Sequence, residues 1–153
     1  MSVLTFKQLN FGWNAEPNAP FPRVSKYDTD ILLQFFLNSS QFPQFRENEN
    51  GALRFSKAAK FRVGATNDEG WYLGQCRYSH LVPRWGQFYE LIGSDPVCDD
   101  PDDWEVIALP DAAKRHFLFY LRDDTFEVFA DDWSFDERSD NALLRLQGNV
   151  RTT

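Results

Sequence analysis

Hydrophobic and polar residues alternate along residues 53–63 with a clear period of two. The predicted apolar face holds Leu53, Phe55, Ala59, Phe61 and Val63, and the opposite face holds Arg54, Ser56, Lys60 and Arg62, together with Ala58. A period of two is typical of a β-strand with one buried side. Lys57 interrupts the apolar face, so the segment predicts either one long strand or two strands that meet at a bulge near Lys57.

Two aromatic-rich runs give the strongest local signal. Residues 117–121 and 126–130 are separated by Arg-Asp-Asp-Thr, which is a compact turn sequence. In the second run Phe126, Val128 and Ala130 alternate with Glu127, Phe129 and Asp131, so one side is better buried than the other. This pattern predicts a β-hairpin.

The run from Ile31 to Leu37 contains six apolar residues out of seven. A short apolar run between turn-forming residues favours a strand that is buried on both faces. A helix over 28–38 is the alternative, because the residues Asp-Thr-Asp at 28–30 are able to cap one.

Shorter strand patterns cover residues 3–9, 71–79 and 104–109, and residues 87–92 are expected to form a short strand or a helical turn. We therefore predict one mainly β domain over residues 1–153, built as an antiparallel β-barrel or sandwich with one or two short helices and a frayed tail at 148–153. The alternative is an α+β fold with helices at 28–38 and 139–147. With 153 residues and 42% hydrophobic residues, the chain is able to bury a sizeable core.

Aromatic residues are also frequent between the predicted strands. Phe11, Trp13 and Phe21 lie in a proline-rich segment that we expect to cross over the core as an irregular arm. Phe42 and Phe45 lie in a polar loop and are expected to plug the core from that side.

The net charge of −7 limits the classes of partner. Phosphate backbones and anionic lipids repel an acidic chain, so we expect neither nucleic-acid nor membrane binding. The first residues lack a basic segment followed by an apolar one, and two cysteines make no disulfide framework. We expect a cytoplasmic protein.

Motifs for catalysis or metal binding are absent from the sequence. His80 and His116 are the only histidines, and Ser79 is unsuited to form a dyad with His80 because adjacent strand residues point to opposite faces. Cys76 and Cys98 have no zinc-site spacing, and the acidic loop at 95–105 lacks the central glycine of a calcium loop. We expect no metal, no cofactor and no catalytic residues, and we lean against an enzyme.

One candidate site is a basic face. If the strand at 71–79 pairs with the strand before it, Arg54 and Arg62 share a face with Gln75 and Arg77, and Trp71 adds an apolar wall. Arg62, Trp71, Gln75 and Arg77 then form a predicted site for a small anionic or aromatic ligand inside a β-barrel. Periodicity does not decide whether this face points into the core or away from it.

The other candidate site is acidic. Its carboxylates are expected to meet a basic protein partner, and they are Asp99, Asp100, Asp102, Asp103, Asp131 and Asp132. Charge complementarity of this kind mainly raises the association rate and selects partners. Our first functional hypothesis is a non-catalytic, acidic protein-interaction module of the adaptor, regulator or immunity type. The alternatives are the ligand-binding barrel and an enzyme without a known motif.

Overall fold

The computed structural model of the protein describes residues 4–64, 86–93, 104–108, 114–121 and 124–137. These residues form ten β-strands and no helix. The strands are β1 (Leu4–Gln8), β2 (Arg23–Tyr27), β3 (Asp30–Phe36), β4 (Asn50–Ser56), β5 (Lys60–Gly64), β6 (Phe88–Gly93), β7 (Glu105–Val106), β8 (Arg115–Tyr120), β9 (Thr125–Ala130) and β10 (Asp132–Asp136).

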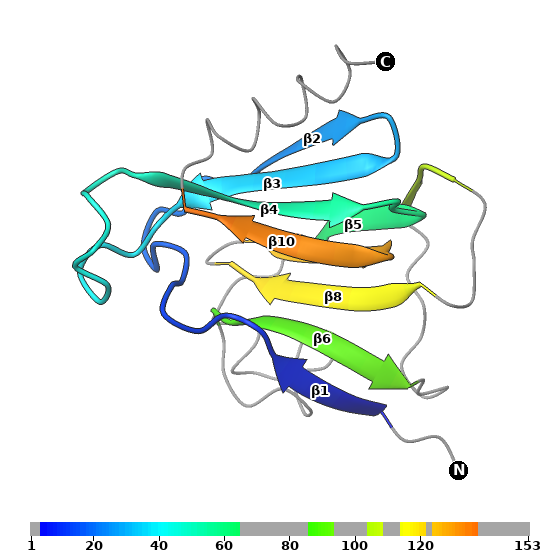
Figure 1. Ribbon diagram of the computed structural model, residues 1–153, viewed down its shortest axis with the longest axis horizontal. Coiled ribbons are helices and arrows are strands. Elements are labelled where there is room, and N and C mark those ends of the chain that lie inside the picture. The colour runs from blue at the N-terminus through cyan, green and yellow to red at the C-terminus, as the bar shows by residue number, and fades with distance from the viewer. Residues whose placement is uncertain (1–3, 65–85, 94–103, 109–113, 122–123, 138–153) are drawn as a thin grey trace.

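The strands build two antiparallel sheets (Figure 1). One sheet has six strands in the order β1-β6-β8-β9-β5-β7, and the other has four in the order β10-β4-β3-β2. The fold is therefore a sandwich, which confirms the predicted mainly β class, and it is not a closed barrel. The expected tail at 148–153 and the helix at 139–147 lie outside the described residues.

The alternative helix at 28–38 is wrong, because β3 occupies this segment. Ile31, Leu33 and Phe35 enter the core between the sheets, and Leu32 packs with Ala52 on the other side of the four-stranded sheet. Successive residues of a strand point to opposite faces of the sheet, so this apolar run places buried apolar side chains on both faces.

The two sheets are joined by strands that turn a corner. β4 leads into β5 and β9 leads into β10, so each pair of consecutive strands passes from one sheet to the other. Lys57 has a φ of 50° at this corner, and the next amide, that of Ala58, donates a hydrogen bond to the Thr29 carbonyl. Of the two arrangements that the alternation at 53–63 allowed, the structure has two strands that meet at Lys57.

Phenylalanine rings fill the space between the sheets. Phe55 from the four-stranded sheet lies 5.4 Å from Phe117 and 5.6 Å from Phe126, measured between ring centroids. Offset and tilted ring pairs at these distances add about 0.5–1.5 kcal/mol to the burial of the rings. The predicted β8–β9 hairpin supplies a large share of this core, and its presence is confirmed.

The proline-rich arm places one of its three aromatic residues in the core. Trp13 is 6% exposed and stacks on Phe135 with centroids 4.0 Å apart, whereas Phe11 and Phe21 are 73% and 61% exposed. The expectation that all three cover the core is therefore wrong for Phe11 and Phe21. Phe45 is buried in the core as expected, and Phe42 packs against it.

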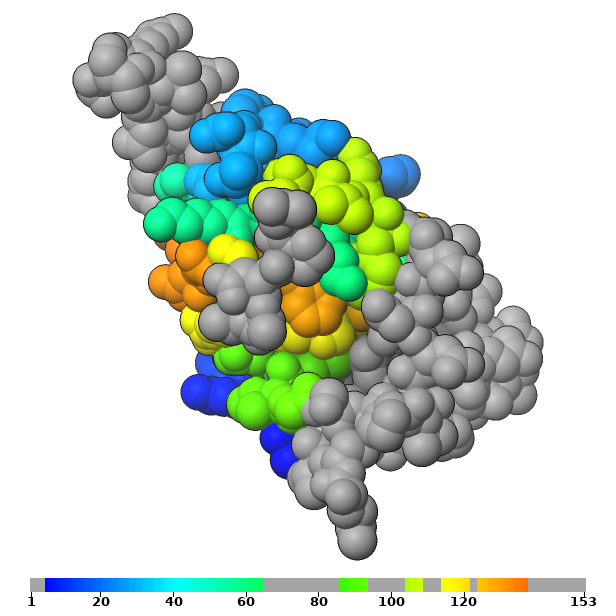
Figure 2. Space-filling model, turned by 90° about the vertical axis from the view of Figure 1, so that its right-hand side faces the viewer, coloured from blue at the N-terminus to red at the C-terminus, as the bar shows by residue number. Residues whose placement is uncertain are grey.

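Ion pairs connect the two sheets at both edge strands of the four-stranded sheet, β2 and β10. On one side Lys26 of β2 contacts Glu105 of β7 at 2.6 Å, and Figure 2 shows β7, in yellow-green, against the blue strands of the other sheet. On the other side Arg115 of β8 contacts Asp132 of β10 at 2.9 Å. Both contacts link strands that belong to different sheets.

Candidate functional site

Most residues of the two predicted sites lie outside the described part of the chain. These are Trp71, Gln75, Arg77, Asp99, Asp100, Asp102 and Asp103. Arg62, Asp131 and Asp132 are described, and they lie in different environments.

Arg62 lies on the face of the six-stranded sheet that points away from the sandwich core. It pairs across the strands with Glu127 of β9, and its Nη1 atom lies 3.2 Å from Glu127 Oε1. Arg54 belongs to the four-stranded sheet, where it binds Asp30 at 2.7 Å. The prediction that Arg54 and Arg62 share one face is wrong, because the corner at Lys57 sends their strands into different sheets.

Glu127 is the most deeply buried carboxylate of the described residues, with no exposed surface. Besides Arg62, it contacts His116 of β8, whose Nε2 lies 2.9 Å from Glu127 Oε2. The His116 ring in turn stacks on Phe129 at 4.3 Å. A buried carboxylate needs such partners, because transferring it from water without them costs several kcal/mol.

Aromatic rings continue this cluster toward β7. The Lys60 Nζ lies 4.6 Å from the centre of the Trp104 ring and 5.1 Å from that of Phe129. The sequence did not predict this cluster. The period-two pattern assigned the basic residues of the segment 53–63 to one face, and it gave no sign that a buried carboxylate from another strand lies opposite them. The available signal was the single acidic residue Glu127 within the aromatic run 126–130.

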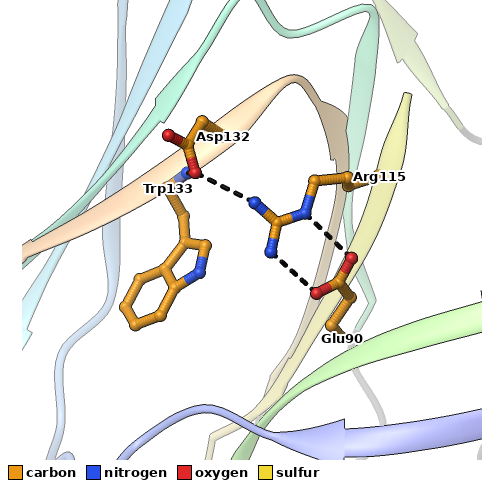
Figure 3. Close-up of polar contacts among 4 residues, drawn as sticks. All are labelled: Glu90, Arg115, Asp132 and Trp133. Atoms are coloured by element: carbon orange, nitrogen blue, oxygen red, sulfur yellow. Dashed lines mark hydrogen bonds and ion pairs between the residues drawn. The ribbon is translucent and has the colours of Figure 1, made fainter. Parts of the chain in front are cut away.

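Asp131 and Asp132 lie at the corner where β9 passes into β10. Lys114 Nζ donates to Asp131 Oδ1 at 2.7 Å, and Arg115 Nη1 donates to Asp132 Oδ1 at 2.9 Å. Figure 3 shows Arg115 between Asp132 and Glu90, with the Trp133 indole beside them. The two predicted partner-binding carboxylates thus each hold a basic residue of the same chain.

Arg115 is fixed mainly by Glu90 of β6. Its Nε donates to Glu90 Oε2 at 2.9 Å and its Nη2 to Oε1 at 2.8 Å, which is a two-pronged contact. The hydrogen bonds that Arg115 donates to Glu90 raise the pKa of Arg115 above its ordinary value, with a smaller contribution from Asp132, although burial acts in the opposite direction. Arg115 also lies over the Phe117 ring at 5.0 Å.

Strand β10 forms one edge of the four-stranded sheet, and within the described residues it pairs only with β4. Trp133 and Phe135 pack against the core, while Asp132, Ser134 and Asp136 alternate with them. The strands predicted from the sequence do not include this segment. Period-two alternation of Asp132–Asp136 was the signal, but it covers only five residues.

The chemistry of the described residues offers charge and hydrogen bonding, and no cluster of three His, Cys, Asp or Glu side chains among them is able to hold a metal ion. In the same part of the chain, no helix is both long and apolar enough to cross a bilayer.

No protein-family model, no curated protein and no solved structure matches the chain.

Proposed function

We propose that the protein is a non-catalytic interaction module that binds a basic protein partner along the acidic edge strand β10. The observation that carries the proposal is the position of carboxylates on an edge strand. Asp132 and Asp136 belong to β10, and Asp131 and Glu137 flank it. An edge strand offers backbone groups to an incoming extended segment, and the carboxylates select for a segment that carries Lys or Arg.

Two of the other edge strands, β1 and β2, differ from β10 in charge. β1 carries Lys7, and β2 carries Arg23 and Lys26, so both present basic residues. β7 carries the acidic Glu105, but it is only two residues long and Glu105 binds Lys26. Among the edge strands of the described residues, β10 is therefore the one that is both acidic and several residues long, which gives a basic partner a preferred strand.

The internal ion pairs at the corner leave acceptors for a partner. Asp132 uses its Oδ1 atom for both Arg115 and the Trp133 amide, and Asp131 uses its Oδ1 for Lys114. The side chain of Asp132 is 68% exposed. An additional Lys or Arg is able to bind the second oxygen of either carboxylate without displacing the internal one.

The test begins with native mass spectrometry of the protein purified gently from its own host, which identifies the partner by its mass. The affinity is then compared between wild type, Ser134→Lys and Ser40→Lys. Both variants change a serine to lysine and raise the net charge by one, but Ser134 lies in β10 and Ser40 in an exposed loop. We expect Ser134→Lys to weaken binding by about tenfold or more, because it places a like charge against the basic partner.

We expect Ser40→Lys to leave the affinity nearly unchanged, and we expect wild-type binding to weaken as salt is added. Equal effects of the two variants would show that net charge matters and that β10 does not. An affinity that stays constant between low and high salt would contradict the proposal as a whole.

The second hypothesis placed a small anionic or aromatic ligand inside a β-barrel, and the sandwich that the described residues form has no such closed interior. Its residue Arg62 already binds an internal carboxylate, that of Glu127. The ligand site with Trp71, Gln75 and Arg77 stays a prediction from sequence, as does the enzyme hypothesis.

A further inference from the structure

A half-open cavity of about 370 Å³ lies at one end of the sandwich, and none of its lining residues belongs to β10. Four segments line it: residues 14–18 of the proline-rich arm, the turn at 38–41, residues 86–87 before β6, and residues 120–121 at the end of β8. Ligand pockets in proteins usually measure about 300–1,000 Å³, so this cavity is large enough for a small molecule. Its lining is rich in amide side chains, those of Asn14, Asn18, Asn38, Gln41 and Gln87.

Backbone amides fix the orientation of two of these side chains. The Ala15 N–H donates to Asn14 Oδ1 at 2.8 Å, and the Gln41 N–H donates to Asn38 Oδ1 at 3.1 Å. A backbone N–H only donates, so each contacted atom is the side-chain oxygen and the NH₂ group is the remaining end. Asn38 then donates from Nδ2 to Gln41 Oε1 at 3.3 Å, which orients Gln41 in the same way.

A second chain of hydrogen bonds orients Gln87. The Phe88 N–H donates to Asn10 Oδ1 at 3.0 Å, so the Nδ2 of Asn10 is a donor, and it contacts Gln87 Oε1 at 2.7 Å. Gln8 Nε2 donates to the same oxygen at 3.3 Å. The oxygen of Gln87 is therefore occupied by the protein itself, and its NH₂ group is left over.

The result is a common arrangement at three positions of the lining. In each case the amide oxygen accepts a hydrogen bond from within the protein; the three residues are Asn14, Gln41 and Gln87. Among the described residues, no acceptor contacts any of the three NH₂ groups. Glu16 adds one acceptor, because the Asn18 N–H binds only its Oε1. The cavity thus combines three uncharged donors with one carboxylate oxygen.

We propose that this cavity binds a neutral polyhydroxylated molecule, a saccharide. Sugar hydroxyls accept hydrogen bonds from the three NH₂ groups and also donate one to Glu16, which matches both kinds of group in the lining. The Glu16 carboxylate and the net charge of −7 disfavour an anion. An extended peptide is a poorer fit, because peptides add along a sheet edge whereas this cavity lies among loops and strand ends.

Nuclear magnetic resonance tests the proposal directly on the side-chain NH₂ signals of Asn14, Gln41 and Gln87 in the full chain. The probes are maltotriose, cellotriose and triacetylchitotriose, each added up to about 50 mM, which detects dissociation constants in the millimolar range. We expect at least one of these sugars to shift all three NH₂ pairs. Sodium sulfate and N-acetyl-trialanine amide serve as the anionic and peptide comparisons.

Three isosteric variants test the donors one at a time. Asn14→Asp, Gln41→Glu and Gln87→Glu keep the oxygen that binds the protein and remove the NH₂ group, so we expect the fold to persist and sugar binding to weaken by about tenfold in each. Gln34→Glu makes the same change on β3 outside the cavity, and we expect it to bind sugar like wild type. Gln41→Met, which removes the donor without adding charge, separates the loss of the NH₂ group from repulsion.

Specific results overturn the proposal. No shift of the three NH₂ pairs with any of the sugars would do so, as would a stronger response to sulfate or to the peptide. Sugar binding that survives in all three isosteric variants would also contradict it. None of these results depends on the acidic edge β10, so this inference stands or fails separately from the proposed interaction with a basic partner.

Discussion

Arg62 and Glu127 lie directly opposite each other in β5 and β9, and they form a 3.2 Å ion pair in which the carboxylate has no exposed surface. Replacing Arg62 with methionine keeps the apolar stem and removes the charge, so Glu127 stays buried with one partner fewer. Loss of one member of a buried pair costs about 3–5 kcal/mol, and we expect a value at the lower end because His116 still contacts the carboxylate.

A double-mutant cycle in urea measures this coupling. We expect Glu127→Gln to restore part of the stability that Arg62→Met removes, because the neutral amide needs no charged partner. If the changes in the free energy of unfolding caused by the two single substitutions simply add up to the change in the double variant, Arg62 and Glu127 do not stabilise each other.

The two-pronged contact between Arg115 and Glu90 predicts a difference between arginine and lysine at position 115. Arg115→Lys keeps the positive charge but loses the planar fork that binds both carboxylate oxygens. We expect a loss of about 1 kcal/mol, since Arg115 is partly exposed and pairs of this kind are screened by water. Denaturation of Arg115→Lys beside Lys114→Arg, a nearby exchange in the opposite direction, checks this, and equal stabilities of the three proteins would contradict it.

The pH dependence of the same contact has a definite sign. Because Glu90 raises the pKa of Arg115, the stabilisation is fully present below the ordinary arginine pKa and is lost only as the pH rises through the raised value. The guanidinium keeps its proton throughout the range from about pH 6 to pH 9. We expect the stability difference between wild type and Arg115→Met to be constant over this range in urea titrations, and a difference that shrinks toward pH 9 would be inconsistent with this.

Local patterns in the sequence predict the parts of the fold that local contacts build. The β8–β9 hairpin and the doubly buried β3 follow from apolar runs next to turn residues, so the prediction succeeds for both. β2 and β10 were missed, because their short runs mix polar and apolar residues and each depends on a neighbour in the sheet. A period of two assigns a residue to a face but not to a sheet, which is why Arg54 and Arg62 were grouped wrongly.

In the candidate sites too, some features can be predicted from local sequence and others depend on the fold. The acidic character at Asp131 and Asp132 can be predicted from the sequence, since adjacent carboxylates are visible there. The contact of Asp132 with Arg115 depends on strands of two different sheets, so only the fold reveals it. The free NH₂ groups around the cavity are still less predictable, because each depends on which atom of an amide meets a backbone N–H.

Two aromatic residues of one short segment provide a matched test of the core. Trp13 stacks on Phe135 inside the sandwich, and Phe11 is exposed to solvent. We expect Trp13→Ala to cost about 3–5 kcal/mol, as other large aromatic deletions in cores do, and Phe11→Ala to change stability by less than about 0.5 kcal/mol. Urea denaturation measures both, and a similar loss in the two variants would mean that the arm does not insert Trp13 into the core.

Thr125 contains the one buried side-chain polar atom of the described residues that lacks a hydrogen-bond partner. Burial of this hydroxyl at the start of β9 costs about 1–3 kcal/mol of desolvation free energy, and no hydrogen bond compensates for it. Valine has nearly the same shape and no hydroxyl, so we expect Thr125→Val to raise the free energy of unfolding by about 1 kcal/mol. Thr125→Ser, which keeps the hydroxyl and loses the methyl group, should lower it instead. Thermal and urea denaturation of the three proteins measure this order, and a valine variant less stable than wild type would show that the Thr125 hydroxyl is bound in solution.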